Sequence, residues 1–137
     1  MGQANQKIHS FLMFEGAAEE AINLYTSLFD QSEIINITRY EANQGGTEGS
    51  VMHATFSIKG QEFMASDSYV QHAFTFTPSI SLFVTCDSEE EIDHAFEILS
   101  QDGEVLMPLD AYPFSSRFGW VNDRFGVSWQ LSLPLSL

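Results

Sequence analysis

An internal repeat is the sequence feature that most constrains the fold of this chain. Residues 11–35 align with residues 82–106 without a gap. The matched pairs are Glu19 with Glu90, Glu20 with Glu91, Tyr25 with Phe96, Leu28 with Leu99, Glu33 with Glu104, and Ile34 with Val105. Each copy predicts a strand, then an amphipathic helix, then another strand. The chain is therefore expected to build one structural unit twice.

Both predicted helices carry an apolar stripe at helical spacing. In residues 17–29 the stripe consists of Ala18, Ala21, Ile22, Tyr25, Leu28 and Phe29, and in residues 88–101 of Ile92, Ala95, Phe96 and Leu99. A stripe of this kind favours burial against a sheet. Ser88 stands three residues before Glu91, which is typical of a capping box at a helix start, and Gly103 is well placed to end the second helix.

Further strands follow each helix, so that each unit is predicted to be βαβββ and the fold class α+β. In the first half the strands are residues 33–40, 50–58 and 61–66, with a tight turn at Lys59 and Gly60. A loop with Gly45, Gly46 and Gly49 is interpreted as mobile or adjacent to a ligand. In the second half, residues 116–121 and 127–133 flank a turn at residues 122–126.

The length favours one domain made of two modules. A chain of 137 residues with 44% hydrophobic residues can bury one core, whereas two independent cores would be hard to build. We expect module one at about residues 8–67, a connector at about 68–78 and module two at about 79–133.

Composition excludes several classes of protein. The formal net charge of −14 repels phosphate backbones, which argues against a nucleic-acid partner. The same charge would attract a cationic ligand, although a role in solubility also explains the acidic side chains. The apolar runs are too short to span a membrane. The polar start of the chain lacks a secretory signal, which predicts a cytoplasmic protein. The single Cys86 cannot form an internal disulfide and is expected to be buried.

Strand alternation sorts the side chains onto two faces. The apolar set, expected under the helices, is Met52, Ala54, Phe56, Ile58, Ile80, Leu82, Val84, Val127, Trp129 and Leu131. The opposite, semipolar set includes His53, Thr55, Ser79, Ser81, Phe83 and Gln130. The first strand fits either orientation. We place Leu12 and Phe14 under the helices, so that His9, Phe11 and Met13 share the face of His53.

The predicted ligand pocket lies on this semipolar face. Its residues are Phe11, Met13, His53, Thr55, Ser79, Ser81, Phe83, Trp120 and Gln130. Each also has a structural interpretation. A histidine on such a face can simply be hydrogen-bonded, Gln130 can bridge neighbouring strands, and Trp120 and Trp129 can belong to the core.

Four stretches together resemble a known superfamily. They are His-Ser-Phe-Leu-Met-Phe at residues 9–14, Glu-Glu-Ala-Ile-Asn-Leu-Tyr at 19–25, Val-Met-His-Ala at 51–54 and Asp-Arg-Phe-Gly-Val-Ser-Trp-Gln at 123–130. Over residues 8–133 the chain is similar to the PhnB-like, or demethylubiquinone-methyltransferase-like, branch of the vicinal oxygen chelate superfamily, which includes glyoxalases and bleomycin-resistance proteins. The resemblance implies a glyoxalase-like fold, with curved mixed sheets around a cleft, and a homodimer. The sequence has no glycine-rich loop after a strand to hold an S-adenosyl cofactor.

The resemblance also implies positions for a metal ion. Metal-dependent members hold a divalent ion with four inward-facing residues, which correspond here to His9, His53, Ser79 and Gln130. Imidazole is a good ligand for Zn, Ni, Mn or Fe, amide oxygen a weak one and serine a poor one. The expected ligand set is therefore His9, His53 and Gln130.

Two functions remain open from the sequence. The first is a small-molecule-binding protein that sequesters a cationic or aromatic ligand in the semipolar cleft. The alternative is a divalent-metal-dependent lyase, isomerase or dioxygenase that acts on a small oxygen-rich substrate.

Overall fold

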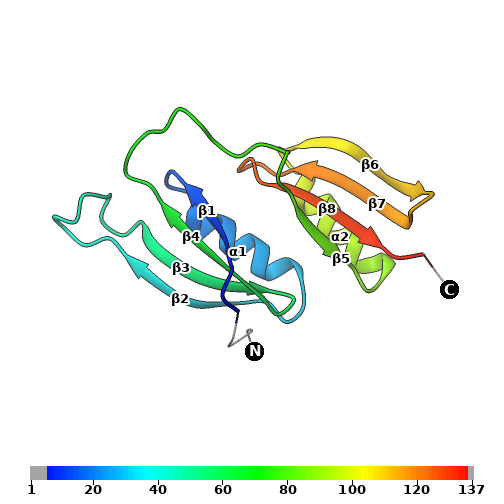
Figure 1. Ribbon diagram of the computed structural model, residues 1–137, viewed down its shortest axis with the longest axis horizontal. Helices are drawn as coiled ribbons and strands as arrows, with labels where there is room; N and C mark the ends of the chain where they lie inside the picture. Colours follow the sequence, from blue (N-terminus) through cyan, green and yellow to red (C-terminus); the bar gives the residue numbers. More distant parts are fainter. Residues whose placement is uncertain (1–5, 136–137) are drawn as a thin grey trace. The chain divides into compact units, whose positions relative to one another are not determined.

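Each half of the chain folds as one helix on a four-stranded sheet, which confirms the predicted pair of βαβββ modules and the α+β class (Figure 1). The computed structural model describes residues 6–135. Its chain divides into two compact units between His72 and Ala73. The expected single domain stays a prediction.

The first unit has strand order β1-β4-β3-β2, in which β1 is parallel to β4 and the other neighbours are antiparallel. Its elements are β1 (Ser10–Phe14), α1 (Ala18–Leu28), β2 (Glu33–Arg39), β3 (Val51–Ile58) and β4 (Gln61–Asp67). The second unit repeats this arrangement with strand order β5-β8-β7-β6. Its elements are β5 (Leu82–Thr85), α2 (Glu89–Ser100), β6 (Glu104–Tyr112), β7 (Ser115–Asn122) and β8 (Ser128–Leu133).

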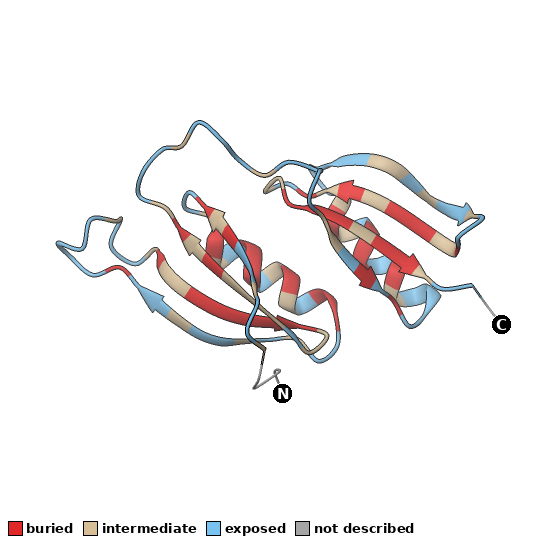
Figure 2. Ribbon diagram, in the orientation of Figure 1, coloured by how far each residue is buried: buried red, intermediate tan, exposed pale blue. Residues whose placement is uncertain are grey.

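The core of each unit lies between its helix and its sheet (Figure 2). The apolar stripe of each helix is buried, with Ile22 and Tyr25 at 0% exposure and Phe96 and Leu99 at 8% and 1%. Leu12 and Phe14 are buried as well, which confirms the orientation chosen for the first strand. Neither of these helices, within residues 6–135, has the length and apolar character that a membrane crossing would need.

A buried carboxylate joins three elements of the first unit. Asp67, at the end of β4, is 3% exposed. Its Oδ1 accepts hydrogen bonds from the backbone N–H groups of Gly16 at 2.8 Å and Ala18 at 2.9 Å, and its Oδ2 accepts one from Val51 N–H at 3.0 Å. Ala17, at the start of α1, provides no side-chain cap. Asp67 of β4 therefore accepts the hydrogen bonds of the backbone N–H groups at this helix end.

The second helix starts as predicted and ends differently. Ser88 Oγ accepts from Glu91 N–H at 3.1 Å, which confirms the cap. After α2 the residue with left-handed backbone is Asp102, at φ 58°, and not Gly103. Gly103 is required for another reason, because a Cβ there would lie 2.2 Å from the carbonyl oxygen of Asn122.

The strand predicted to begin at Ser79 begins three residues later, so its predicted start is wrong. β5 begins at Leu82, which pairs with Trp129 near the start of β8, so residues before Leu82 have little strand to pair with. Ser79 lies in a turn, where its hydroxyl bonds Thr77 Oγ1 at 2.8 Å. Ile80, expected under the helices, is 79% exposed.

Candidate functional site

The face of the first sheet that points away from α1, here called the first open face, brings together four of the predicted site residues. Cross-strand registers place Met13 beside Ser66 and both Phe11 and Thr55 beside Met64. The rings of Phe11 and His53 approach to 6.0 Å between centroids, with 53° between their planes. Phe11 is 52% exposed, so this face presents an aromatic ring next to an imidazole.

The two histidines of the expected metal set do not meet on this face. His9 Nε2 lies 3.4 Å from Glu62 Oε1. In the register of the sheet, His53 on β3 lies level with Met13 on β1, which stands four residues after His9. β4 runs between β1 and β3. Rises of about 3.4 Å per residue and strand spacings of about 4.8 Å put the two residues more than about 13 Å apart.

That separation decides the fit of a metal ion. Two imidazoles that share one ion each hold it at about 2.0–2.1 Å, so their ligating nitrogens lie within about 4 Å of each other. His9 and His53 of the first unit therefore do not form one ligand pair. No group of three or more His, Cys, Asp or Glu suited to a metal occurs anywhere in residues 6–135. The wider set with Gln130 of the second unit stays a prediction, and we assign no chemistry to a metal here.

The corresponding face of the second sheet, here called the second open face, carries the other predicted residues except Ser79. Gln130 pairs with Phe83 on one side and with Trp120 on the other. The Gln130 amide donates to Ser81 Oγ at 2.8 Å, and Trp120 Nε1 donates to Ser128 Oγ at 2.8 Å. Phe83 is 59% exposed. A fixed amide thus lies between two aromatic side chains.

An aromatic cluster extends this face and was missed from the sequence. Phe118 lies 6.4 Å from Phe83, 5.7 Å from Tyr112 and 5.0 Å from Phe114, measured between ring centroids. Phe118 itself is 3% exposed, whereas Phe114 is 59% exposed. Alternation could have found Phe118, because it stands two residues from Trp120 on the same strand and so shares its face.

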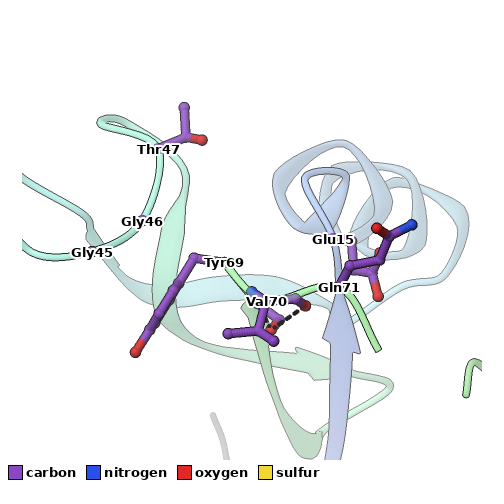
Figure 3. Close-up of a pocket in the computed structure, with 8 residues that line it drawn as sticks. Glu15, Gly45, Gly46, Thr47, Tyr69, Val70 and Gln71 are labelled. Carbon is purple, nitrogen blue, oxygen red and sulfur yellow. Dashed lines mark hydrogen bonds between the residues drawn. The ribbon is translucent and has the colours of Figure 1, made fainter. Parts of the chain in front are cut away.

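A pocket of about 390 Å³ lies in the first unit, where β1 and β4 end. It is lined by Glu15, Gly45, Gly46, Thr47, Ser68, Tyr69, Val70 and Gln71 (Figure 3). The glycine-rich loop between β2 and β3 forms one side. The glycines of that loop are visible in the sequence, whereas the residues opposite come from two other segments of the chain and carry no such signal.

The arginines at the helix–sheet contacts are occupied. Arg39 donates to both carboxylate oxygens of Glu19, at 2.6 and 2.8 Å, and this hydrogen-bonded pairing lowers the pKa of Glu19. Arg117 donates to Asp93 on α2, and this hydrogen bond raises the pKa of Arg117. Each arginine ties a strand to its helix, so neither is offered to an anion on the open faces.

Comparison with known proteins gives consistent matches. The family model described as 3-demethylubiquinone-9 3-methyltransferase matches residues 6–132. A solved structure described as a putative 3-demethylubiquinone-9 3-methyltransferase, PhnB protein, from Bacillus cereus is 67% identical, covers 93% of this chain and 99% of its own, and has a TM-score of 0.91. The protein PA1353 from Pseudomonas aeruginosa is 25% identical, covers 96% and 100%, and has a TM-score of 0.83.

More distant structures establish the fold. A glyoxalase family protein from Bacillus cereus is 14% identical, covers 98% of this chain and 100% of its own, and has a TM-score of 0.64. These matches confirm the resemblance seen in the sequence and the glyoxalase-like fold. The chain belongs to the PhnB-like family described as 3-demethylubiquinone-9 3-methyltransferase, and it has a glyoxalase-like fold.

Proposed function

We propose that this protein binds a small planar aromatic molecule on the second open face and holds it without a metal ion. The observation that carries the proposal is the position of Phe83, whose ring is 59% exposed beside the side chain of Gln130. An exposed ring beside a polar group that is already oriented is typical of ligand sites, where apolar contact gives affinity and a few polar groups fix orientation.

The neighbouring side chains support the same ligand class. Phe83 and Trp120 flank Gln130, and a planar ligand can stack on rings that lie at the surface. The Gln130 amide nitrogen donates to Ser81, which orients its carbonyl oxygen as an acceptor. The net charge of −14 favours cationic over anionic ligands. A cationic aromatic molecule can therefore both stack on these rings and be attracted by the negative charge of the protein.

The first open face offers a second aromatic contact of the same kind. Phe11 is 52% exposed and approaches His53 to 6.0 Å between ring centroids. We propose Phe11, Met13, His53 and Thr55 as a separate, second surface for a ligand of the same class, within the first unit. The metal-dependent alternative has no comparable support, because His9 and His53 do not form a ligand pair within their unit.

Two matched probes test the proposal. 9-Aminoacridine is a planar aromatic cation, and anthracene-9-carboxylate is an anion with a ring system of similar size. We expect saturable binding of 9-aminoacridine by calorimetry, with weaker binding of the anion. Phe83→Ala should reduce the affinity for 9-aminoacridine by roughly three- to tenfold, which is the usual worth of an aromatic contact.

Val105→Ala is the matched control. Val105 is also an exposed apolar residue, at 47%, but it pairs with the buried Val121 and so lies on the other face of the sheet. This change should leave the affinity for 9-aminoacridine unaltered. Failure of both probes to bind, or equal losses in the two variants, would count against the proposed function.

A further inference from the structure

The pocket at the end of β1 and β4 has its own chemistry, separate from both open faces. Its two ends differ (Figure 3). In this view the glycine loop and Tyr69 lie on one side, and Glu15 and Gln71 lie together on the other, with Val70 between them. Tyr69 is 63% exposed and Val70 is 51% exposed. Tyr69 and Val70 therefore supply apolar surface at one end, beside the hydroxyl of Thr47, and Glu15 and Gln71 supply polar groups at the other.

The apolar end is held in place by the loop. Gly46 approaches the ring of Tyr40 so closely that a Cβ would lie 2.6 Å from a ring carbon, and a Cβ added at Gly45 would lie 3.6 Å from the ring of Tyr69. The loop is closed by hydrogen bonds from Tyr40 N–H to Ser50 O and from Gly49 N–H to Tyr40 O, both 2.9 Å. The wall of the pocket is therefore formed before any ligand arrives.

The segment opposite is also ordered by hydrogen bonds. Ser68 N–H donates to Phe14 O at 2.7 Å, and Ser68 Oγ accepts from Val70 N–H at 3.1 Å and lies 2.9 Å from His72 Nε2. The ring of Tyr69 meets that of Tyr40 edge-on, at 87° and 6.0 Å between centroids. Tyr69 and Val70 thus present their side chains from a fixed backbone.

Charge identifies the class of ligand. Among the eight residues that line the pocket, Glu15 has the only charged side chain. It is exposed, and its Oε2 accepts one long hydrogen bond, from His72 N–H at 3.4 Å. Arg39, the basic residue that ends β2 before this loop, is paired with Glu19. The carboxylate of Glu15 is therefore not neutralised by an arginine in this part of the unit.

We infer that this pocket binds a small amphipathic amine, whose ammonium group bonds Glu15 and whose apolar body lies against Tyr69 and Val70. A volume of about 390 Å³ fits a molecule of this class. A charge-assisted hydrogen bond to Glu15 supplies selectivity for the ammonium group. The inference does not depend on the function proposed for the open faces.

The test uses phenethylamine and its neutral analogue 2-phenylethanol, which share a phenyl ring and differ in the charged group. In the intact protein, phenethylamine should shift the backbone amide resonances of Gly45, Thr47 and Gln71 with one saturable dissociation constant. The alcohol should bind about tenfold more weakly, since it lacks the charged donor. Equal affinities for the two probes, or no saturable shift at these amides, would overturn the inference.

Two glutamate variants locate the charge. Glu15→Gln should weaken phenethylamine binding about tenfold. Glu48→Gln removes a carboxylate from an exposed residue of the glycine loop. Glu48 does not line the pocket, so this change should leave binding unchanged. Equal losses in the two variants would show general attraction to an acidic protein and would contradict a site at Glu15. Melting curves of both variants confirm that each is folded.

Tyr69→Leu and Phe83→Ala separate the two proposals. Tyr69→Leu should weaken phenethylamine binding by several-fold through loss of the ring contact, and unchanged binding would contradict the assignment of the apolar end. Phe83→Ala should leave phenethylamine binding at the pocket amides unaltered. Loss of amine binding in Phe83→Ala alone would move the amine to the second open face and reject the pocket.

Discussion

Replacing Asp67 by Asn should destabilise the protein far more than its small change in size suggests. The carboxylate of Asp67 accepts three backbone hydrogen bonds, from Gly16, Ala18 and Val51. An asparagine oxygen can keep the first two, but its NH₂ group then faces the N–H of Val51, and two donors cannot bond each other. The change therefore removes one bond and leaves a buried donor without an acceptor.

The size of the effect follows from these contacts. A buried N–H left unsatisfied costs about 1–3 kcal/mol. The two retained bonds lose their charged acceptor, and α1 loses a negative charge at its start, which together cost about 1 kcal/mol more. We expect Asp67→Asn to lower the free energy of unfolding by about 2–4 kcal/mol.

Urea unfolding followed by far-UV circular dichroism measures this change, provided that the m-value stays constant. Glu62→Gln is the matched control, because Glu62 is an acid on the same strand whose side chain is 19% exposed and lies 3.4 Å from His9. It should cost less than about 1 kcal/mol. Amide exchange at Val51 gives a local reading. A loss below about 1 kcal/mol in Asp67→Asn, with Val51 still protected, would refute the reasoning.

Four further outcomes are expected. Arg39 lowers the pKa of Glu19 in the folded state. The stabilisation by Glu19 is therefore present above its unfolded pKa and is lost as the pH falls through its folded pKa. The urea midpoints of Glu19→Gln and of the wild-type protein should converge in acid. Gly119→Ala should cost about 1–3 kcal/mol in thermal unfolding, since its Cβ would lie 2.4 Å from the ring of Phe96. His53→Ala should cost less than about 1 kcal/mol yet weaken 9-aminoacridine binding at the first open face. Stoichiometric metal in untagged protein that this variant loses would instead favour the metal-dependent enzyme. Light scattering should give a dimer mass at micromolar concentration, because exposed apolar side chains need cover, and a monomer mass would reject the homodimer.

Local sequence patterns were sufficient to predict most of the elements. The helix at residues 17–29 was observed as Ala18–Leu28, and the turn at Lys59 and Gly60 has φ values of 50° and 86°, which match the tight hairpin expected there. Burial of Tyr25 and Phe96 followed from helical spacing alone. These features depend on residues a few positions apart, which is why the sequence showed them.

Features that depend on distant pairing could not be predicted in the same way. Alternation placed His9 and His53 on one face but could not say that β4 lies between their strands, or that His53 stands in the row of Met13. For that reason alternation could not show that His9 and His53 are too far apart within the first unit to share one ion. The start of β5 was misplaced because it depends on where β8 begins. The pocket combines three separate segments, and only its glycine loop left a signal.

The parallel pairing of β1 with β4 has a consequence for folding during synthesis. Ser10 meets Phe63 in this pairing, so β1 leaves the ribosome well before the strand it needs. At about 5–20 residues per second, β4 follows after about 3–10 seconds. Leu12 and Phe14 have no native sheet partner during that interval. We infer that the β3–β4 hairpin forms first and that β1 pairs with it afterwards. A nascent chain halted before residue 61 should therefore resist proteases poorly, whereas one whose β4 has left the ribosome should resist them well.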